Sequence, residues 1–122
     1  MTDPGQLVRS YLEIIASREV EDDRAYLADT DFSYTSPIGN QDNADRLIED
    51  TARFAPIMDS MTIRKLVVDG EDVVVVVDVG IALQEYMNRT AALIFTVKDE
   101  RIQTIEAIFN ASEYFKLFEL DE

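Results

Sequence analysis

The sequence contains no cysteine, no histidine and no tryptophan among its 122 residues. Without cysteine, disulfide bonds, thiolate nucleophiles and zinc–thiolate sites are excluded. Without histidine, the chain lacks the commonest metal ligand and the side chain most often used for proton transfer near neutral pH. A Ser-His-Asp triad is excluded for the same reason. Only four isolated glycines are present, so there is no glycine-rich phosphate loop. We therefore expect neither a metal site nor a cofactor.

Basic residues are scarce as well. The chain has 11 Lys and Arg against 25 Asp and Glu, which gives a formal net charge of −14. Phosphate backbones and anionic lipids repel such a chain, so we expect neither nucleic acid nor a membrane surface as a partner. No apolar run reaches the roughly 20 residues that span a bilayer, and no signal peptide is recognisable. The prediction is a cytoplasmic protein with a single domain over residues 1–122.

Helical spacing of apolar residues predicts three helices in the N-terminal half of the chain. The first begins at the N-cap Asp3, the second covers about 21–28, and the third follows Asp42, a good capping residue. A short alternating strand over 31–36 separates the second helix from the third. Pro56 ends the third helix, because the residue before a proline avoids the helical conformation.

From Ser60 onward the pattern is typical of strands. Four are predicted, over 61–68, 71–86, 90–97 and 101–110, with tight turns between them. This order gives an α+β protein with three N-terminal helices packed on an antiparallel meander. The acidic tail, residues 111–122, contains several aromatic residues, and we expect it to cover a sheet edge or to join a partner subunit.

The strongest strand signal is the run of five valines from Val73 to Val77. Valine has a stiff side chain that packs well on a pleated surface, which indicates a long central strand. Asp78 interrupts this apolar run. A carboxylate in such a strand is either a poised catalytic group or a surface residue on the polar face of a two-faced strand.

Three stretches resemble the nuclear-transport-factor-2-like superfamily, the cone-shaped, cystatin-like fold of ketosteroid isomerases and SnoaL-type polyketide cyclases. They are Leu7–Leu12 (LVRSYL), Tyr34–Gly39 (YTSPIG) and Arg101–Phe109 (RIQTIEAIF). The resemblance covers nearly the whole chain, from about residue 6 to residue 109. It implies that the helices pack on a strongly curved antiparallel sheet, with a pocket at the open end of the cone.

Ketosteroid isomerases use a tyrosine and a protonated aspartic acid to bind the oxyanion, and a second aspartate as the base. By resemblance the tyrosine corresponds to Tyr11, the base falls at Ser36 and the protonated acid falls near Leu93. A serine hydroxyl cannot act as the proton shuttle without an activating base, and leucine carries no donor. Cyclase-like chains place an acid after the aromatic residue that ends the last strand, where this chain has Asn110. We therefore do not expect steroid isomerisation.

The resemblance also implies which side chains face the pocket. They form an apolar cup with few polar groups, and they are Tyr11, Ile15, Ser36, Phe54, Val77, Val79, Ile81, Leu93, Phe95, Ile105, Ala107 and Phe109. Tyr11 is the candidate hydrogen-bond donor, with Ser36 and Asn110 as auxiliary polar or catalytic groups. The alternative is that these side chains simply fill the cone, because protein interiors pack closely. On this assignment Asp78 lies on the outer face of the sheet, where water or an arginine of a partner subunit satisfies it.

Two functions of different classes follow. The first is a SnoaL-like domain that binds a small hydrophobic molecule, with a weak isomerase, lyase or cyclase activity left open. The second is a non-catalytic homodimer module that associates through the outer sheet face. We favour the first, because a cup lined by apolar side chains suits a small molecule held by one or two hydrogen bonds.

Overall fold

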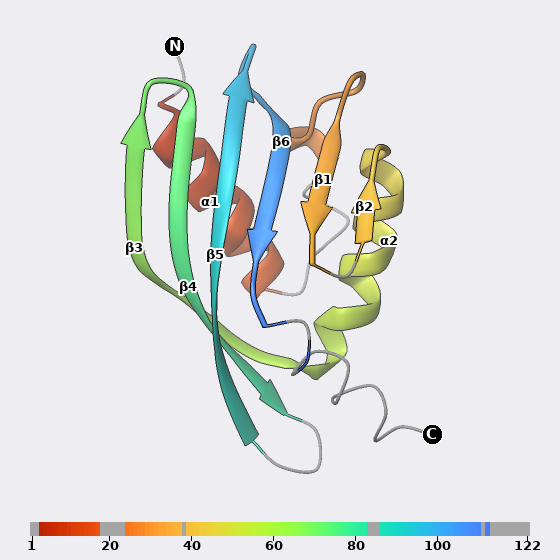
Figure 1. The fold of residues 1–122 in the computed structure, drawn as a ribbon, viewed down its shortest axis with the longest axis vertical. Coiled ribbons are helices and arrows are strands. Elements are labelled where there is room, and N and C mark those ends of the chain that lie inside the picture. Colours follow the sequence, from red (N-terminus) through yellow and green to blue (C-terminus); the bar gives the residue numbers. More distant parts are fainter. Residues whose placement is uncertain (1–2, 18–23, 38, 83–85, 111, 113–122) are drawn as a thin grey trace.

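A curved sheet of six strands, with helices against its inner face, forms the part of the chain that the computed structural model describes (Figure 1). The described residues are 3–17, 24–37, 39–82, 86–110 and 112. The elements are α1 (Pro4–Ala16), β1 (Ser33–Ser36), β2 (Gly39–Gln41), α2 (Ala44–Phe54), a short 3-10 helix (Ala55–Ile57), β3 (Met58–Asp69), β4 (Asp72–Ala82), β5 (Tyr86–Lys98) and β6 (Arg101–Ile108). The strand order is β2-β1-β6-β5-β4-β3.

Helix α1 begins where the sequence predicted. Asp3 is its N-cap, and the side-chain carboxylate accepts a hydrogen bond from the Gly5 N–H at 3.1 Å. Pro4 occupies the first helical position, where its missing N–H costs nothing. The apolar face of the helix is buried against β3 and β4, so α1 covers the half of the sheet on which those two strands lie.

The predicted helix over 21–28 is wrong for the residues that the structure describes, which start at Arg24. Residues 24–26 form one 3-10 turn, and Leu27 then makes a parallel bridge to Ile102. The Ala28 N–H donates to the Ile102 carbonyl at 3.0 Å. The Leu27 N–H still donates to the Arg24 carbonyl at 3.2 Å, which closes the 3-10 turn, but the chain then pairs with β6 and does not continue as a helix. The described part of the chain therefore has two α-helices, not three.

The third predicted helix is α2, and it begins one residue later than expected. Its cap is Asn43, whose Oδ1 accepts from the backbone N–H groups of Asp45 at 2.9 Å and Arg46 at 3.3 Å. The short strand β2, which precedes this cap, was not predicted. It forms a hairpin with β1 that extends the sheet beyond β6.

The meander of β3, β4, β5 and β6 is antiparallel, as predicted. The sheet as a whole is mixed, however, because β1 pairs with β6 in parallel, with Tyr34 opposite Ile105. Parallel neighbours require a long connection between them, and here α2 and the first three meander strands supply it. Register shifts in β3, between Met58 and Ser60 and between Ile63 and Lys65, mark irregularities of the kind that bend a strand.

The valine run alternates between the two faces of β4. Val73, Val75 and Val77 are at most 1% exposed, whereas Val74 is 37% exposed on the opposite, outer face. Asp78 also lies on the outer face, since it shares the parity of Val74 along the strand.

An arginine binds Asp78, but it belongs to the same chain rather than to a partner. Arg64 donates to both carboxylate oxygens, at 3.0 and 3.1 Å, and the Thr90 hydroxyl donates at 2.7 Å. These three residues come from the neighbouring strands β3, β4 and β5. Asp78 is therefore part of a cross-strand polar network, and it lies away from the inner face of the sheet.

The acidic tail, residues 111–122, was expected to cover a sheet edge or to join a partner subunit. Except for Ser112, these residues lie outside the described part of the chain, so this stays a prediction. In the described ranges, no helix combines the length and the apolar character needed to cross a membrane.

Two adjacent valines of β4 allow a matched test of which side chains face the inside of the sheet and which face the outside. Val75→Ala removes two buried methyl groups and leaves a void, so it should lower the free energy of unfolding by about 2 kcal/mol. Val74→Ala changes an exposed position and should stay within about 0.5 kcal/mol of the wild type. Urea unfolding at low micromolar protein concentration measures both. Equal effects of the two substitutions would contradict the assignment.

Candidate functional site

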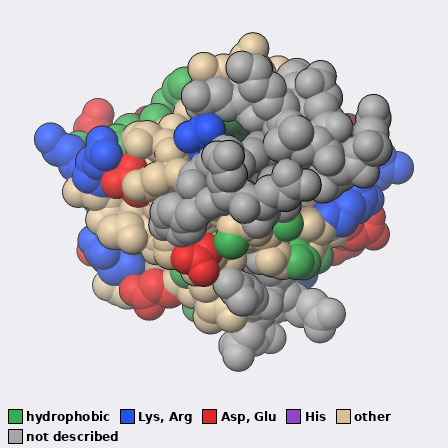
Figure 2. Space-filling model, turned by 90° about the horizontal axis from the view of Figure 1, so that it is seen from below, with side chains coloured by type: hydrophobic (Ala, Val, Ile, Leu, Met, Phe, Trp, Pro, Cys, Tyr) green, Lys and Arg blue, Asp and Glu red, His purple; other side chains and the backbone are tan. Residues whose placement is uncertain are grey.

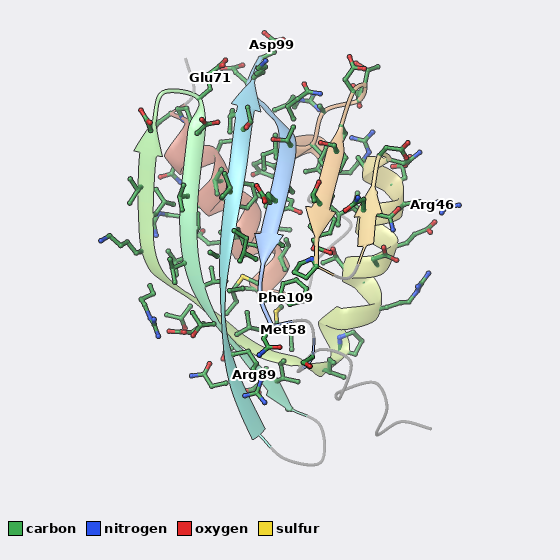
Figure 3. The ribbon with its side chains drawn as sticks, viewed as in Figure 1. Arg46, Met58, Glu71, Arg89, Asp99 and Phe109 are labelled. Atoms are coloured by element: carbon green, nitrogen blue, oxygen red, sulfur yellow. The ribbon has the colours of Figure 1, made fainter. Side chains whose placement is uncertain are left out.

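A cavity of about 660 Å³ lies between the two helices and the inner face of the sheet. Every strand and both α-helices contribute residues to its wall. Figure 3 shows Met58, Arg89 and Phe109, three of the lining residues, at the end of the sheet where the long strands curve beneath α2. The volume lies in the range of sites that hold small molecules.

The structure places nearly all the predicted pocket residues on this wall. The predicted residues that line the cavity are Tyr11, Ile15, Ser36, Val77, Val79, Ile81, Leu93, Phe95, Ile105, Ala107 and Phe109. Phe54 is the remaining predicted pocket residue, and its side chain is not among those that the structure describes. Asn110 lines the cavity as well. The sequence therefore identified the rows of side chains that face inward, although their role in binding stays a prediction.

Tyr11 is held in place by two other aromatic rings. Its side chain is 3% exposed, and its ring packs edge-to-face against Phe95, with centroids 6.1 Å apart, and against Tyr26 at 6.5 Å. Such pairs add to the stability gained from burial alone. The position of this candidate donor is thus set by packing between α1, β5 and the segment that precedes β1.

The other two candidate polar groups differ in their surroundings. The Ser36 hydroxyl donates to the Gly39 carbonyl at 2.8 Å and so stabilises the tight connection between β1 and β2. Its proton is engaged locally, which fits a structural role better than that of a base. Asn110 lies two residues beyond the end of β6 and is exposed at the cavity wall, and an amide side chain can both donate and accept hydrogen bonds.

Sequence reasoning missed a polar group on α2. Asp50 lines the cavity, and its Oδ2 accepts a hydrogen bond from Gln41 Nε2 of β2 at 2.8 Å. Its Oδ1 lies 3.5 Å from the Arg53 guanidinium, one helical turn further on. Both Gln41 and Arg53 also line the cavity. A signal was available, because Asp50 is three residues after the core residue Leu47 and so borders the buried face of the helix.

Sequence reasoning also missed Arg89 of β5, although its position in the strand offered a signal. The predicted inward row of this strand was Leu93 and Phe95, and the same alternation continues through Ala91 to Arg89. Arg89 stands opposite Val79 of β4, and its Nη1 donates to the Asn88 carbonyl at 3.1 Å. Extending the row by two more steps would have placed this guanidinium on the cavity wall.

The chemistry of the cavity follows from this distribution. Apolar side chains of the sheet and α1 form most of the wall, while charged and amide groups come from α2, β2, the far end of β5 and Asn110 beyond β6. Asp50 is the one carboxylate among the described lining residues. Figure 2 views the molecule from below, and described acidic and basic side chains are visible on both its left and right sides. The arrangement can enclose an apolar body and make polar contacts at one side.

Comparison with known proteins identifies the fold through solved structures alone, since no family model and no curated protein matches the sequence. One similar structure is an NTF2-like protein of unknown function from Cytophaga hutchinsonii, with a TM-score of 0.81, 15% identity, and coverage of 94% of this chain and 96% of the other. An LEH-like epoxide hydrolase from M. tuberculosis has a TM-score of 0.78 and 18% identity, over 93% and 86% of the two chains.

A third similar structure is TerC, co-crystallised with polyporic acid. It has a TM-score of 0.80 and 17% identity, and the match covers 96% of this chain and 99% of the other. At these identities the likeness concerns the arrangement of the backbone, and function resides in the side chains that each chain adds. The chain has the nuclear-transport-factor-2-like fold.

Proposed function

We propose that this protein binds a small, largely apolar molecule in the cavity between its helices and its sheet. The observation that carries the proposal is the cavity itself, about 660 Å³ in volume and lined by apolar side chains from α1, β4, β5 and β6. Burying a ligand against such a wall gains roughly 25 cal/mol per Å² of apolar surface. Tyr11, Asn110 and the charged groups of α2 and β5 line the same cavity, where they can contact the ligand.

Two of the similar structures support this proposal. One is described as an epoxide hydrolase and another was co-crystallised with polyporic acid, so chains with this fold act on or bind small molecules. The two ketosteroid isomerase carboxylates have no counterpart at Ser36 and Leu93, and the proposal therefore concerns binding and not steroid isomerisation.

Filling the cavity from one strand gives a direct test. Ala91 lines the cavity, and the adjacent Ala92 points to the outer face of β5. Ala91→Phe should weaken binding of the neutral fluorescent probe N-phenyl-1-naphthylamine at least tenfold, because the new ring occupies the space that the probe needs. Ala92→Phe, the matched control, should leave the affinity within about twofold. A fluorescence titration measures both, and circular dichroism confirms that each variant is folded.

Two results would contradict the proposal. One is the absence of any fluorescence increase when the probe is added to the wild-type protein at high micromolar concentration. The other is equal probe affinity for the Ala91→Phe and Ala92→Phe variants, since the probe would then bind outside the cavity.

We propose self-association as a second function, carried by a different surface. Val67, Val74 and Ile108 are 47%, 37% and 49% exposed, and strand register places them on the outer face of the sheet. Val67 and Val74 are opposite each other on β3 and β4, and adjacent exposed apolar side chains can form part of an interaction site. A homodimer that pairs this face with its copy leaves the cavity on the opposite face accessible to a ligand.

A charge on this face should prevent such a dimer. Ile108→Lys places an ammonium group in the proposed interface and should give a monomer, because a buried unpaired charge is costly. Ala52→Lys, on the exposed side of α2, is the control and should leave the dimer intact. Light scattering coupled to size-exclusion chromatography gives the mass. A wild-type protein that stays monomeric at several hundred micromolar would rule the dimer out.

A further inference from the structure

A hydrogen bond between two elements, α2 and β2, fixes the position of the Asp50 carboxylate. Asp50 belongs to α2, and the Gln41 amide that donates to its Oδ2 at 2.8 Å belongs to β2. Hydrogen bonds to an ionised acceptor are short and strong, so this contact fixes the direction in which the carboxylate faces. A ligand that meets the carboxylate therefore does not have to bear the full entropy cost of ordering it.

This carboxylate can accept more hydrogen bonds than it receives from the protein. An ionised carboxylate offers about four lone-pair positions. The described structure gives Asp50 one hydrogen bond from Gln41 and an ion pair with Arg53 at 3.5 Å. The Arg53 side chain is 78% exposed, so solvent screens that ion pair and it contributes little. Asp50 thus retains acceptor capacity at the wall of the cavity.

The surroundings strengthen any bond that a ligand makes there. The Asp50 side chain is 42% exposed, and the cavity that it lines has a largely apolar wall. A ligand that fills the cavity displaces water from the carboxylate and lowers the local dielectric, which strengthens a charge-assisted hydrogen bond. Hydrogen bonds to charged groups contribute about tenfold to a hundredfold to an equilibrium constant.

The charged side chains of the cavity wall are compatible with two classes of ligand, one that ends in an anion and one that donates hydrogen bonds. Arg53 and Arg89 also line the wall, and their guanidinium groups suit a ligand that ends in an anion. However, the Arg53 side chain is 78% exposed, so solvent screens its charge, and the Nη1 group of Arg89 donates to the Asn88 carbonyl. The chain as a whole carries a formal charge of −14, which repels an anion and attracts a cation over distances of several ångströms. The net negative charge and the Asp50 carboxylate that Gln41 orders therefore favour a ligand that donates hydrogen bonds.

We propose that the cavity selects apolar molecules that carry a hydrogen-bond donor, a hydroxyl or a protonated amine, and that Asp50 binds this donor while Gln41 positions the carboxylate. The proposal rests on the ligand-binding function proposed above and adds the chemical class of the ligand. It assigns the specificity of the cavity to a carboxylate of α2, whereas the sheet and α1 provide affinity for the apolar body.

Three compounds with one apolar skeleton test this selectivity. They are 1-adamantylamine, which is protonated at pH 7, 1-adamantanol, and adamantane-1-carboxylic acid, which is ionised and accepts hydrogen bonds only. Each is titrated against the wild-type protein with bound N-phenyl-1-naphthylamine, and displacement of the probe reports binding. The amine and the alcohol should displace the probe at concentrations at least tenfold lower than the carboxylic acid.

The same titrations on two variants assign the effect to one side chain. Asp50→Asn keeps the shape of the residue and removes its charge, so the affinity for the amine should fall at least tenfold. Glu49→Gln is the matched control: it removes the same charge from the adjacent, exposed position of α2, which is not part of the cavity wall. It should change the affinity for the amine less than twofold. Both variants should still bind the neutral probe, which shows that the cavity is intact.

The outcomes separate this proposal from the one on which it rests. If the probe does not bind the wild-type protein, ligand binding in the cavity fails and the selectivity fails with it. If the probe binds but the carboxylic acid displaces it as well as the amine does, the donor selectivity alone is overturned. Equal losses of amine affinity in Asp50→Asn and Glu49→Gln would also overturn it, because general charge and not Asp50 would then attract the amine.

Discussion

The structure depends on the burial of one face of β4. Its inner valines are almost inaccessible to solvent, and they oppose Phe95 and Leu93 of β5 across the strand register. Because side chains alternate along a strand, a slip of one residue would move this whole row to the outer face and expose it. The register of the sheet is therefore strongly specified. The neighbouring strands pair with β4 in this register, and α1 packs on the inner face that results.

The core and the cavity are parts of the same surface. Along β4 the inward row passes from the buried Val73 to Val79, and along β5 it passes from the buried Phe95 to Arg89. Helix α1 packs on β3 and β4 and closes one part of this surface. Where the strands curve beneath α2, the same alternation lines an open space. One rule of side-chain direction thus produces both a close-packed core and an open cavity.

The two faces of the sheet carry different chemistry for the same reason. The inner face combines apolar rows with polar groups from α2 and β2, whereas the outer face combines exposed valines with the Asp78, Arg64 and Thr90 network. Since the faces do not share side chains, the proposed ligand binding on one and the proposed self-association on the other would not compete for residues. This separation is one physical reason why a single fold can host many functions.

The sequence by itself determined the α+β class, the antiparallel meander and the inward rows of β4, β5 and β6, because strand alternation and helical spacing are local and periodic. The tertiary structure decided what local pattern does not encode. The segment from Leu27 pairs with β6 instead of forming a helix, and β1 joins β6 in parallel, because both depend on partners about 70 residues away along the chain. The placement of Asp50 beside Gln41 on the cavity wall is of the same kind. It depends on how α2 packs against β2, and helical periodicity gives the face of a residue but not the neighbour that this face meets.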